Sequence, residues 1–258
     1  MSEKYKLYGY RWIVLTIFMF TNLTIQMLWI TYAPITGMAA EFYGVTDLQI
    51  GLLSMVFMIA FIPFSIPASW VIDTYGFRIA VGIGVVLMGV FGVLRGIAGT
   101  NYSFVLWSTI GIAIAQPFLL NAWTTIPAKW FPVKSRATAV GLITLANLVG
   151  TALGMVLTPM LVETMSISNV QLIYGGIAAF SSVLFLILAR ETPPTPPCAP
   201  GEETRALMLE GLKYALKIKP FWFYLIVSFF GLGIFNGLTT WIEAIIRPRG
   251  FNLSDAGT

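Results

Sequence analysis

Seven continuously apolar runs constrain most strongly what this chain can fold into. A helix needs about 20 mostly apolar residues to cross a bilayer, and each run has about that length or more. The runs do not alternate apolar and polar residues, so they predict helices rather than the strands of a membrane barrel. We therefore expect an all-α polytopic membrane protein. The expected spans are Trp12–Met38, Leu48–Ile72, Ile79–Ala98, Phe104–Pro127, Ala137–Leu161, Gln171–Ala189 and Phe221–Ile246.

The composition agrees with a lipid environment. Of the 258 residues, 10% are charged and 57% are hydrophobic, with a mean hydropathy of +0.83, whereas a soluble domain has about 25% charged residues. The lipid bilayer is therefore an expected partner. The sequence has no histidine and one cysteine, Cys198, which excludes a disulfide within the chain and leaves no spacing typical of a metal site. We expect no cofactor and no metal.

Basic residues lie between the apolar runs and predict the orientation of the chain. With the N-terminus in the cytoplasm, all but three of the 15 Lys and Arg residues lie on the inner side, which is the bias expected of cytoplasmic loops. The outer three are Arg95, Arg247 and Arg249, and Arg95 is expected to snorkel to the outer surface. This distribution explains the net charge of +4 without nucleic acid as a partner. It also argues against a seven-helix receptor, whose N-terminus would lie outside.

The chain divides into three expected parts. A Pro-rich stretch at 193–197 favours an extended spacer, with an SH3-type ligand as the alternative, and Glu210–Leu216 is expected to form a short amphipathic helix. The polar stretch Asn252–Gly257 echoes Val45–Gly51 at the start of the second span, as parallel transporter repeats do. We expect an incomplete molecule that alone binds weakly and transports nothing. The parts are a six-helix half (1–190), a cytoplasmic linker (191–219), and the seventh helix with the start of the eighth (220–258).

A short charged connector, Asp73-Thr74-Tyr75-Gly76-Phe77-Arg78, separates the second and third spans. It resembles the corresponding loop of the major facilitator superfamily, Gly-x-x-x-Asp-(Arg/Lys)-x-Gly-(Arg/Lys)-(Arg/Lys), with Ser69 at the first Gly. Lys129-Trp130-Phe131-Pro132 and the following Arg136 resemble that superfamily's connector between helices four and five. The resemblance implies a latch at the inner ends of the helices, formed by Asp73, Gly76, Arg78 and Arg136. An ordinary polar turn is the alternative.

A narrower resemblance covers roughly Tyr10–Leu161. Tyr10-Arg11-Trp12-Ile13-Val14, Phe42-Tyr43-Gly44-Val45 and the stretch Leu145–Gly154 resemble the feline leukaemia virus subgroup C receptor-related transporters. That family implies a plasma-membrane solute carrier linked to choline, ethanolamine and, earlier, haem. It implies an aromatic cage whose tryptophan is Trp29. The family's tyrosine and glutamine positions hold Asn236 and Leu148 in this chain. Two of the three cage positions therefore differ from the family's residues.

Helical spacing also indicates a substrate site. Three polar or aromatic residues of the first span lie at i, i+4 and i+7, on one face, and three residues of the seventh span repeat that spacing. The resemblance to the superfamily implies that these two helices face each other across a cavity, so both stripes are expected to line it. Gln116 and Asn121 of the fourth span are about 140° apart on a helix, so we do not expect both to face it. The candidate substrate-binding residues are Asn22, Gln26, Trp29, Gln116, Asn121, Asn147, Asn236, Thr240 and Glu243.

Glu243 is the acidic residue that lies well inside an apolar run. A charge at mid-membrane costs at least about 2.5–3.5 kcal/mol, so we expect Glu243 to face the cavity, as a partner for a cation or as a proton site. The alternative is that it lies near the outer end of its span and pairs with Arg247, one turn later. For Asn22 and Gln26 the alternative is hydrogen bonding between helices.

Small residues crowd two spans, and their expected role is structural. Glycines recur in the third span, and Gly150-x-x-x-Gly154 lies in the fifth. Small residues let membrane helices approach closely. Gly82 and Gly84 do not form a dinucleotide-binding motif, because no strand precedes them.

These features together predict a monomeric secondary transporter that works by alternating access. Trp29 and Glu243 favour a small organic cation as its substrate. The alternatives are a proton-coupled carrier of another polar metabolite, with Glu243 as the proton site, and a non-transporting membrane sensor. A membrane enzyme acting on lipid would need a cluster of acid, base or nucleophile groups at the membrane surface, which the sequence does not show.

Overall fold

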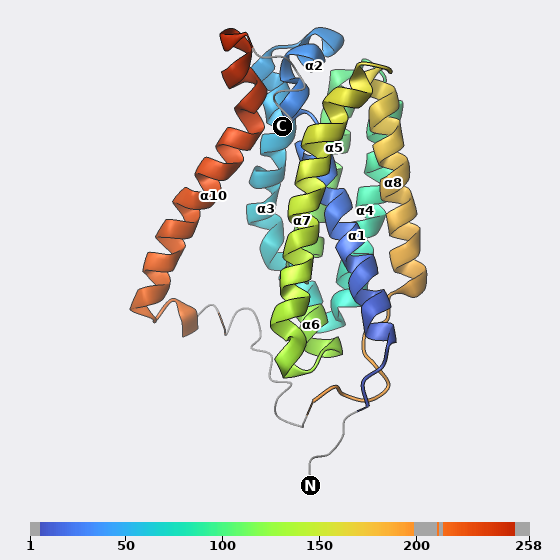
Figure 1. Ribbon diagram of the computed structural model, residues 1–258, viewed down its shortest axis with the longest axis vertical. Helices are drawn as coiled ribbons and strands as arrows, with labels where there is room; N and C mark the ends of the chain where they lie inside the picture. The colour runs from blue at the N-terminus through green and yellow to red at the C-terminus, as the bar shows by residue number, and fades with distance from the viewer. Residues whose placement is uncertain (1–5, 199–210, 212–213, 251–258) are drawn as a thin grey trace.

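The computed structural model describes residues 6–198, 211 and 214–250, and every regular element in that part is a helix. Figure 1 shows most of the long helices standing nearly parallel. We call the end with the α3–α4 turn the inner end and the end with α2 the outer end. The elements are α1 (Tyr10–Ile30), η1 (Ala33–Ile35), α2 (Thr36–Tyr43), α3 (Asp47–Tyr75), α4 (Phe77–Ile97), α5 (Tyr102–Leu120), α6 (Thr125–Trp130), α7 (Val133–Val162), α8 (Ile167–Leu188), α10 (Lys219–Ile246) and η2 (Arg247–Arg249).

The structure confirms the seven predicted spans. Seven helical segments of the described part are long and apolar enough to cross a membrane, the first being α1 through α2 and the fourth α5 through α6. Several helices begin before the apolar run because a polar residue caps them. The Thr46 side chain accepts a hydrogen bond from the Gln49 N–H at the start of α3, and Asn101 caps α5 in the same way. Such side chains satisfy the free N–H groups of a first turn.

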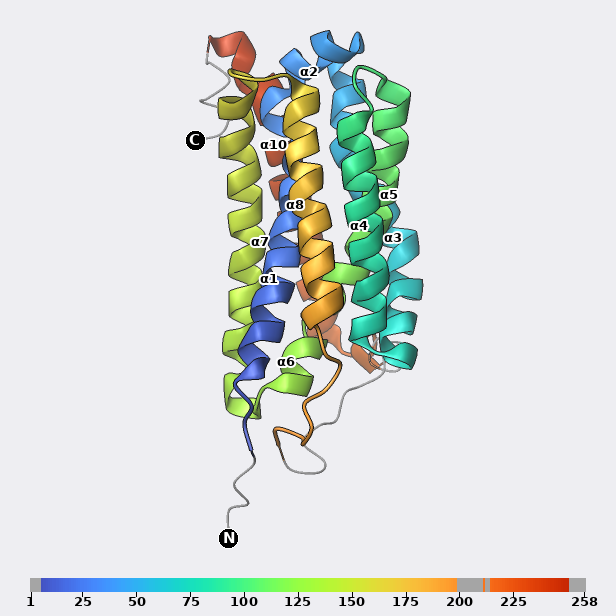
Figure 2. The same ribbon diagram turned by 90° about the vertical axis from the view of Figure 1, so that its right-hand side faces the viewer.

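Six of the spans form one bundle around α1. Helix α1 packs against α7 and α8, α4 packs between α5 and α8, and α3 packs against α5 (Figure 2). Glycines permit the closest approaches, as predicted. A Cβ added to Gly96 on α4 would lie 2.5 Å from the Cα of Leu172 on α8, and one added to Gly150 on α7 would lie 2.8 Å from the Cα of Leu23 on α1.

Arg95 does not snorkel to the surface, and that prediction was wrong. Its side chain is fully buried near the outer end of α4, where its Nη1 donates to the Leu28 carbonyl at 3.0 Å. Its guanidinium carbon lies 5.5 Å from the centre of the Tyr32 ring. Because α4 is packed on both α5 and α8, the arginine is directed into the bundle, where a carbonyl and an aromatic face stabilise the charge.

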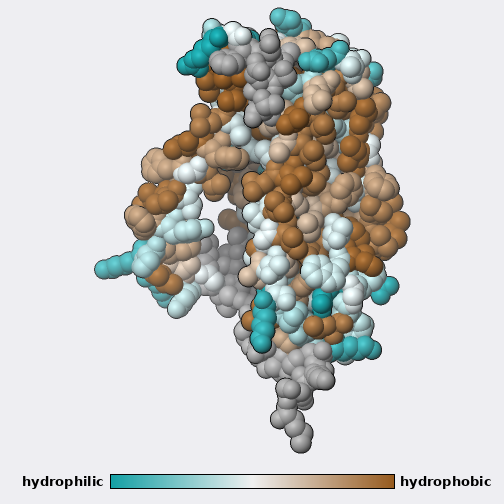
Figure 3. Space-filling view, viewed as in Figure 1, coloured by the Kyte–Doolittle hydropathy of each residue, from teal (hydrophilic) through white to brown (hydrophobic). Residues whose placement is uncertain are grey.

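Helix α10 joins the bundle mainly at its outer end. There it packs on η1, α2 and α3, and Figure 1 shows it diverging from α3 and α7 toward the inner end. The space-filling view shows an opening between the inner half of α10 and the bundle (Figure 3). Large apolar side chains such as Phe223 and Phe229 are about three-quarters exposed along it. Of the predicted boundary features, Asn252–Gly257 and, within Glu210–Leu216, residues 210, 212 and 213 lie outside the described residues.

Candidate substrate site and gates

The polar stripe of α1 lies inside the bundle at mid-height. Gln26 is half-buried, and its Oε1 accepts a hydrogen bond from Nε2 of Gln116 on α5 at 3.3 Å. This pair joins two of the predicted site residues across neighbouring spans. Hydrogen bonds of this kind between membrane helices contribute about 0.6–2 kcal/mol, so the pair also holds α1 against α5.

Asn22 on α1 and Asn147 on α7 have the same local arrangement. Each donates from Nδ2 to the carbonyl four residues earlier, at 2.9 Å, and each is buried. Each side-chain oxygen has no donor among the described residues. Asn147 precedes Gly150, whose backbone meets Leu23, so the two amides lie at similar depth. A buried acceptor without a donor is costly, so a ligand that donates hydrogen bonds to these two oxygens would be stabilised by them.

Trp29 ends the α1 stripe one turn beyond Gln26. It is 3% exposed, and its indole Nε1 is buried without an acceptor among the described residues. Its backbone carbonyl accepts from the Ser54 hydroxyl of α3 at 3.4 Å. Leu148, at the glutamine position of the implied cage, is 55% exposed on α7, beside the buried Asn147.

Asn121 is held elsewhere, at the end of α5. Its Nδ2 lies 2.9 Å from the Ser65 carbonyl, 3.0 Å from the Ser65 hydroxyl and 2.8 Å from the Ser69 hydroxyl, both residues of α3. Asn121 therefore connects α5 to α3, while Gln116 turns toward α1. This divergence agrees with the 140° separation expected on a helix.

The α10 stripe meets the bundle through η1, α2 and α3. Asn236 approaches the sulfur of Met58 on α3 at 3.7 Å. Thr240 and Glu243 are the buried residues of α10. The Glu243 carboxylate accepts from the Gly37 backbone N–H at 3.2 Å and lies 3.6 Å from Nη1 of Arg247. The pairing offered as the alternative for Glu243 is therefore present in this conformation.

Asp47 completes an outer contact that the sequence did not predict. It forms an ion pair with Arg247 from the first turn of α3. Glu243, Arg247, Asp47 and the Gly37 backbone thus connect α10 to α2 and α3; we call these four residues the outer gate. A Cβ at Gly37 would fall on the Arg247 guanidinium, so a larger residue there would require that side chain to shift.

Glu191 holds the inner connector, the Asp73–Arg78 turn between α3 and α4. This residue was not identified from the sequence. Its carboxylate accepts from the backbone N–H groups of Phe77 at 3.2 Å and Arg78 at 2.7 Å, and it forms an ion pair with Lys129 of α6. An anion at the first turn of a helix is favourable because the N–H groups there lack internal partners. Gly76 has φ +89°, and a Cβ there would collide with this carboxylate. The signal available in the sequence was an acid directly after the sixth span, within a basic segment.

Arg136 lies at the start of α7, beside this connector. Its Nε donates to the Phe131 carbonyl and its Nη2 to the Cys198 sulfur, both at 3.2 Å. It therefore braces the α6–α7 turn and the segment after α8.

Comparison with known proteins places the fold in a family. The Major Facilitator Superfamily model matches residues 14–258. Solute carrier family 49 member A3 of Danio rerio is 30% identical over 267 residues, covering 99% of this chain and 56% of the relative. The choline/ethanolamine transporter FLVCR1 of Mus musculus is 29% identical over 265 residues, covering 92% of this chain and 47% of the relative. This chain therefore spans about half the length of the curated relatives that it matches.

A solved structure supports the same fold. A bacterial homologue of the human lysosomal transporter Spinster, in an inward-facing and unoccupied conformation, superposes with a TM-score of 0.79 at 18% identity. It covers 98% of this chain, which covers 59% of that one. The predicted resemblances to the superfamily and to the feline leukaemia virus receptor-related transporters are confirmed, and the relatives are membrane transporters rather than enzymes. The chain belongs to the major facilitator superfamily.

Proposed function

We propose that the protein is a secondary carrier that moves a small organic cation of the ethanolamine or choline type by alternating access. The observation that carries the proposal is the α1 face on which Asn22, Gln26 and Trp29 follow one another. Trp29 places its buried aromatic ring at the end of this stripe, and the Asn22 side-chain oxygen is without a donor among the described residues. An aromatic face and carbonyl-type oxygens both attract an ammonium group.

The side chains near this face favour a primary ammonium over a quaternary one. A primary ammonium has three N–H donors, which match the side-chain oxygens of Asn22 and Asn147. A quaternary ammonium has none and depends on aromatic faces alone. The cage positions held by Asn236 and Leu148 lack an aromatic ring, so an ethanolamine-like amine is the substrate that these residues suit best.

The outer gate and the separation of α10 from the bundle toward the inner end support an alternating-access cycle. The outer gate joins α10 to the six-helix bundle through Glu243, Arg247 and Asp47, while the inner half of α10 stands apart from α3 and α7 (Figure 1). Opening the outer side of the carrier requires these contacts between α10 and the bundle to break. Because the Arg247 and Asp47 side chains are partly exposed, their ion pair is weak, at about 0.2–1 kcal/mol, and suits a contact that must open repeatedly.

The cellular setting is part of the same proposal. The basic inner segments favour a cytoplasmic N-terminus, and we place the carrier in the plasma membrane as a monomer. A tag at Met1 that is accessible only after permeabilising cells supports this orientation. Labelling of that tag on intact cells contradicts it.

A proton-coupled carrier of another polar metabolite is the second candidate. Among the buried residues of the described part, Glu243 is the one that carries a carboxylate. A carboxylate buried within a membrane span can exchange a proton during transport. Its contacts with Gly37 and Arg247 make it part of the outer gate, so proton binding there would act on gate opening.

Uptake of radiolabelled amines into cells that express the full-length gene product tests the function. We expect ethanolamine uptake above that of control cells, with choline a weaker competitor than unlabelled ethanolamine. Uptake of neither amine, from cells in which the protein reaches the membrane, overturns the proposed substrate class. Uptake that requires a proton gradient and excludes both amines supports the second candidate instead.

A further inference from the structure

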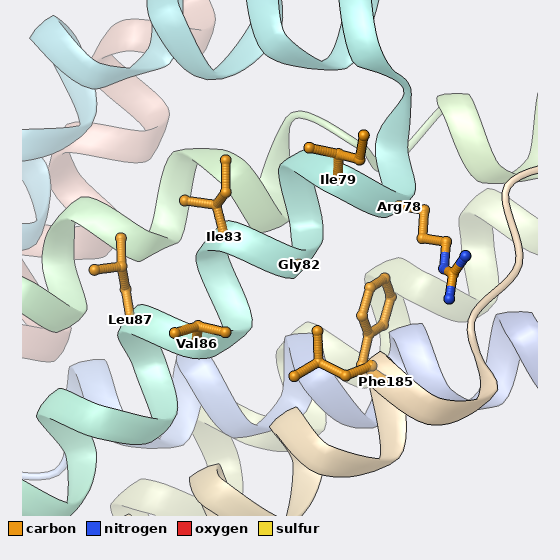
Figure 4. Close-up of a pocket in the computed structure, with 8 residues that line it drawn as sticks. Arg78, Ile79, Gly82, Ile83, Val86, Leu87 and Phe185 are labelled. Carbon is orange, nitrogen blue, oxygen red and sulfur yellow. The ribbon is translucent and has the colours of Figure 1, made fainter.

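A groove runs along the bilayer-facing side of the bundle between α4 and α8, with a volume of about 540 Å³. Ile79, Ile83 and Val86 form its α4 wall, and Phe185 of α8 forms its buried floor (Figure 4). Gly82 opens it, because the nearest atom to a Cβ placed there is 3.8 Å away, on Leu186. The lack of a side chain at Gly82 thus leaves space for the groove between α4 and α8.

The groove has the chemistry and length of one acyl chain. The side chains of Ile79, Ile83 and Val86 are 52%, 41% and 46% exposed, on a helix that spans the membrane, so lipid is the medium that meets them. From Arg78 to Leu87 the helix rises about 14 Å at 1.5 Å per residue. That is about half of the hydrocarbon thickness of a bilayer, or one leaflet.

A positive charge stands at the inner end of the groove. Arg78 is an exposed residue of the first turn of α4, and Figure 4 shows its guanidinium extending past the groove end beside Phe185. Glu191 binds the Arg78 backbone N–H, but its own charge is balanced by Lys129. The guanidinium charge is therefore available to a phosphate, which it can bind through two N–H groups.

The depth of Arg78 matches the level of lipid headgroups. Trp70 and Tyr75, at the inner end of α3, are both more than half exposed and stack edge to face with ring centres 5.7 Å apart. Exposed tryptophan and tyrosine at helix ends mark the membrane interface. Arg78 follows Tyr75 by three residues, so its guanidinium lies at that interface.

We propose that this groove binds an anionic phospholipid, with one acyl chain along α4 and α8 and its phosphate on Arg78. A net negative lipid is favoured over a zwitterionic one because basic residues such as Lys129 and Arg190 lie at this end of the molecule, and basic pockets between membrane helices select anionic headgroups. The site lies outside the bundle, apart from Trp29 and the polar face of α1, so it is independent of the proposed substrate.

Lipid retention measured by native mass spectrometry tests the site. The protein is purified from nanodiscs that contain equal amounts of dioleoylphosphatidylserine and dioleoylphosphatidylcholine. We expect about fivefold preferential retention of phosphatidylserine. Arg78→Gln should remove this preference, and Gly82→Leu should reduce retention of both lipids because the leucine fills the groove.

The matched controls lie on α7. Lys134→Gln removes an exposed charge at the same end, and Gly141→Leu adds a side chain at an exposed glycine with no atom within 4 Å of its Cβ position; both should leave retention unchanged. Equal retention of the two lipids by the unmodified protein overturns the proposal. Lipid retention that is unchanged in Gly82→Leu also overturns it. A preference for phosphatidylserine that Lys134→Gln reduces as strongly as Arg78→Gln overturns it too. Retention of added cholesterol that Gly82→Leu abolishes and Arg78→Gln spares also contradicts a phospholipid site.

Discussion

The carboxylate of Glu243 accepts a hydrogen bond from the backbone N–H of Gly37, with the two atoms 3.2 Å apart. This bond joins α10 to the start of α2, two elements separated by about 200 residues of sequence. Arg247 lies one turn after Glu243 and bridges to Asp47. The acid thus contacts a neighbouring span at its outer end, and Arg247, directly after the end of α10, lies close enough to balance its charge.

Replacing Glu243 by Gln should strongly reduce transport. The amide keeps an oxygen for the Gly37 N–H but loses the attraction to Arg247 and any proton exchange, so the outer gate closes less firmly. Uptake is measured from about pH 5 to pH 8, with Glu163→Gln as a control at an exposed acid of the outer side. Normal uptake by Glu243→Gln across that range would falsify the role assigned to this carboxylate.

Glu191 should stabilise the inner connector through its charge. Glu191→Gln removes the ion pair with Lys129 and the charge at the start of α4, and should lower the free energy of unfolding by about 1–2 kcal/mol, toward the low end because the pair is partly exposed. Thermal unfolding in detergent measures the effect. Lys129→Met should cost a similar amount.

The double variant separates coupling from independent effects. If Glu191 and Lys129 act as a pair, the loss in Glu191→Gln with Lys129→Met is smaller than the sum of the two single losses. Strict additivity, or a loss as large in the exposed-acid control Glu163→Gln, contradicts this assignment.

Gly150 should be irreplaceable where α7 crosses α1. Its added Cβ would lie 2.8 Å from the Cα of Leu23, so Gly150→Ala must push the helices apart, at a cost of about 1–3 kcal/mol. Gly141→Ala on the same helix is the matched control, since nothing lies within 4 Å of its Cβ position. A midpoint of thermal unfolding that falls equally in both variants would show that close packing is not the cause.

The sequence predicted the spans well because helix position depends on local properties. Apolar length defines each span, and capping residues such as Thr46 and Asn101 account for the few residues by which the ends differ. Gln26 forms the hydrogen bond between helices that was predicted from the sequence as the alternative to a substrate role.

Partners across the bundle were not predictable, because they depend on which faces meet. The burial of Arg95 follows from the way α4 packs on its neighbours, and hydropathy alone favoured the surface. Glu191 binds N–H groups more than 110 residues away, so no local pattern reveals its role. Helical geometry predicted that Asn121 and Gln116 lie on different faces of α5. It did not predict the hydrogen bonds from Asn121 to Ser65 and Ser69, which depend on how α5 packs on α3.

Binding of radiolabelled ethanolamine to Trp29 variants tests most directly the claim that α1 presents an ammonium site. A cation over an aromatic ring contributes about 0.5–2 kcal/mol, so Trp29→Ala should raise the dissociation constant by about 2-fold to 30-fold. Trp29→Phe keeps a smaller ring and should raise it less. Equal weakening by the two variants, or no weakening by either, would contradict the site proposed on α1.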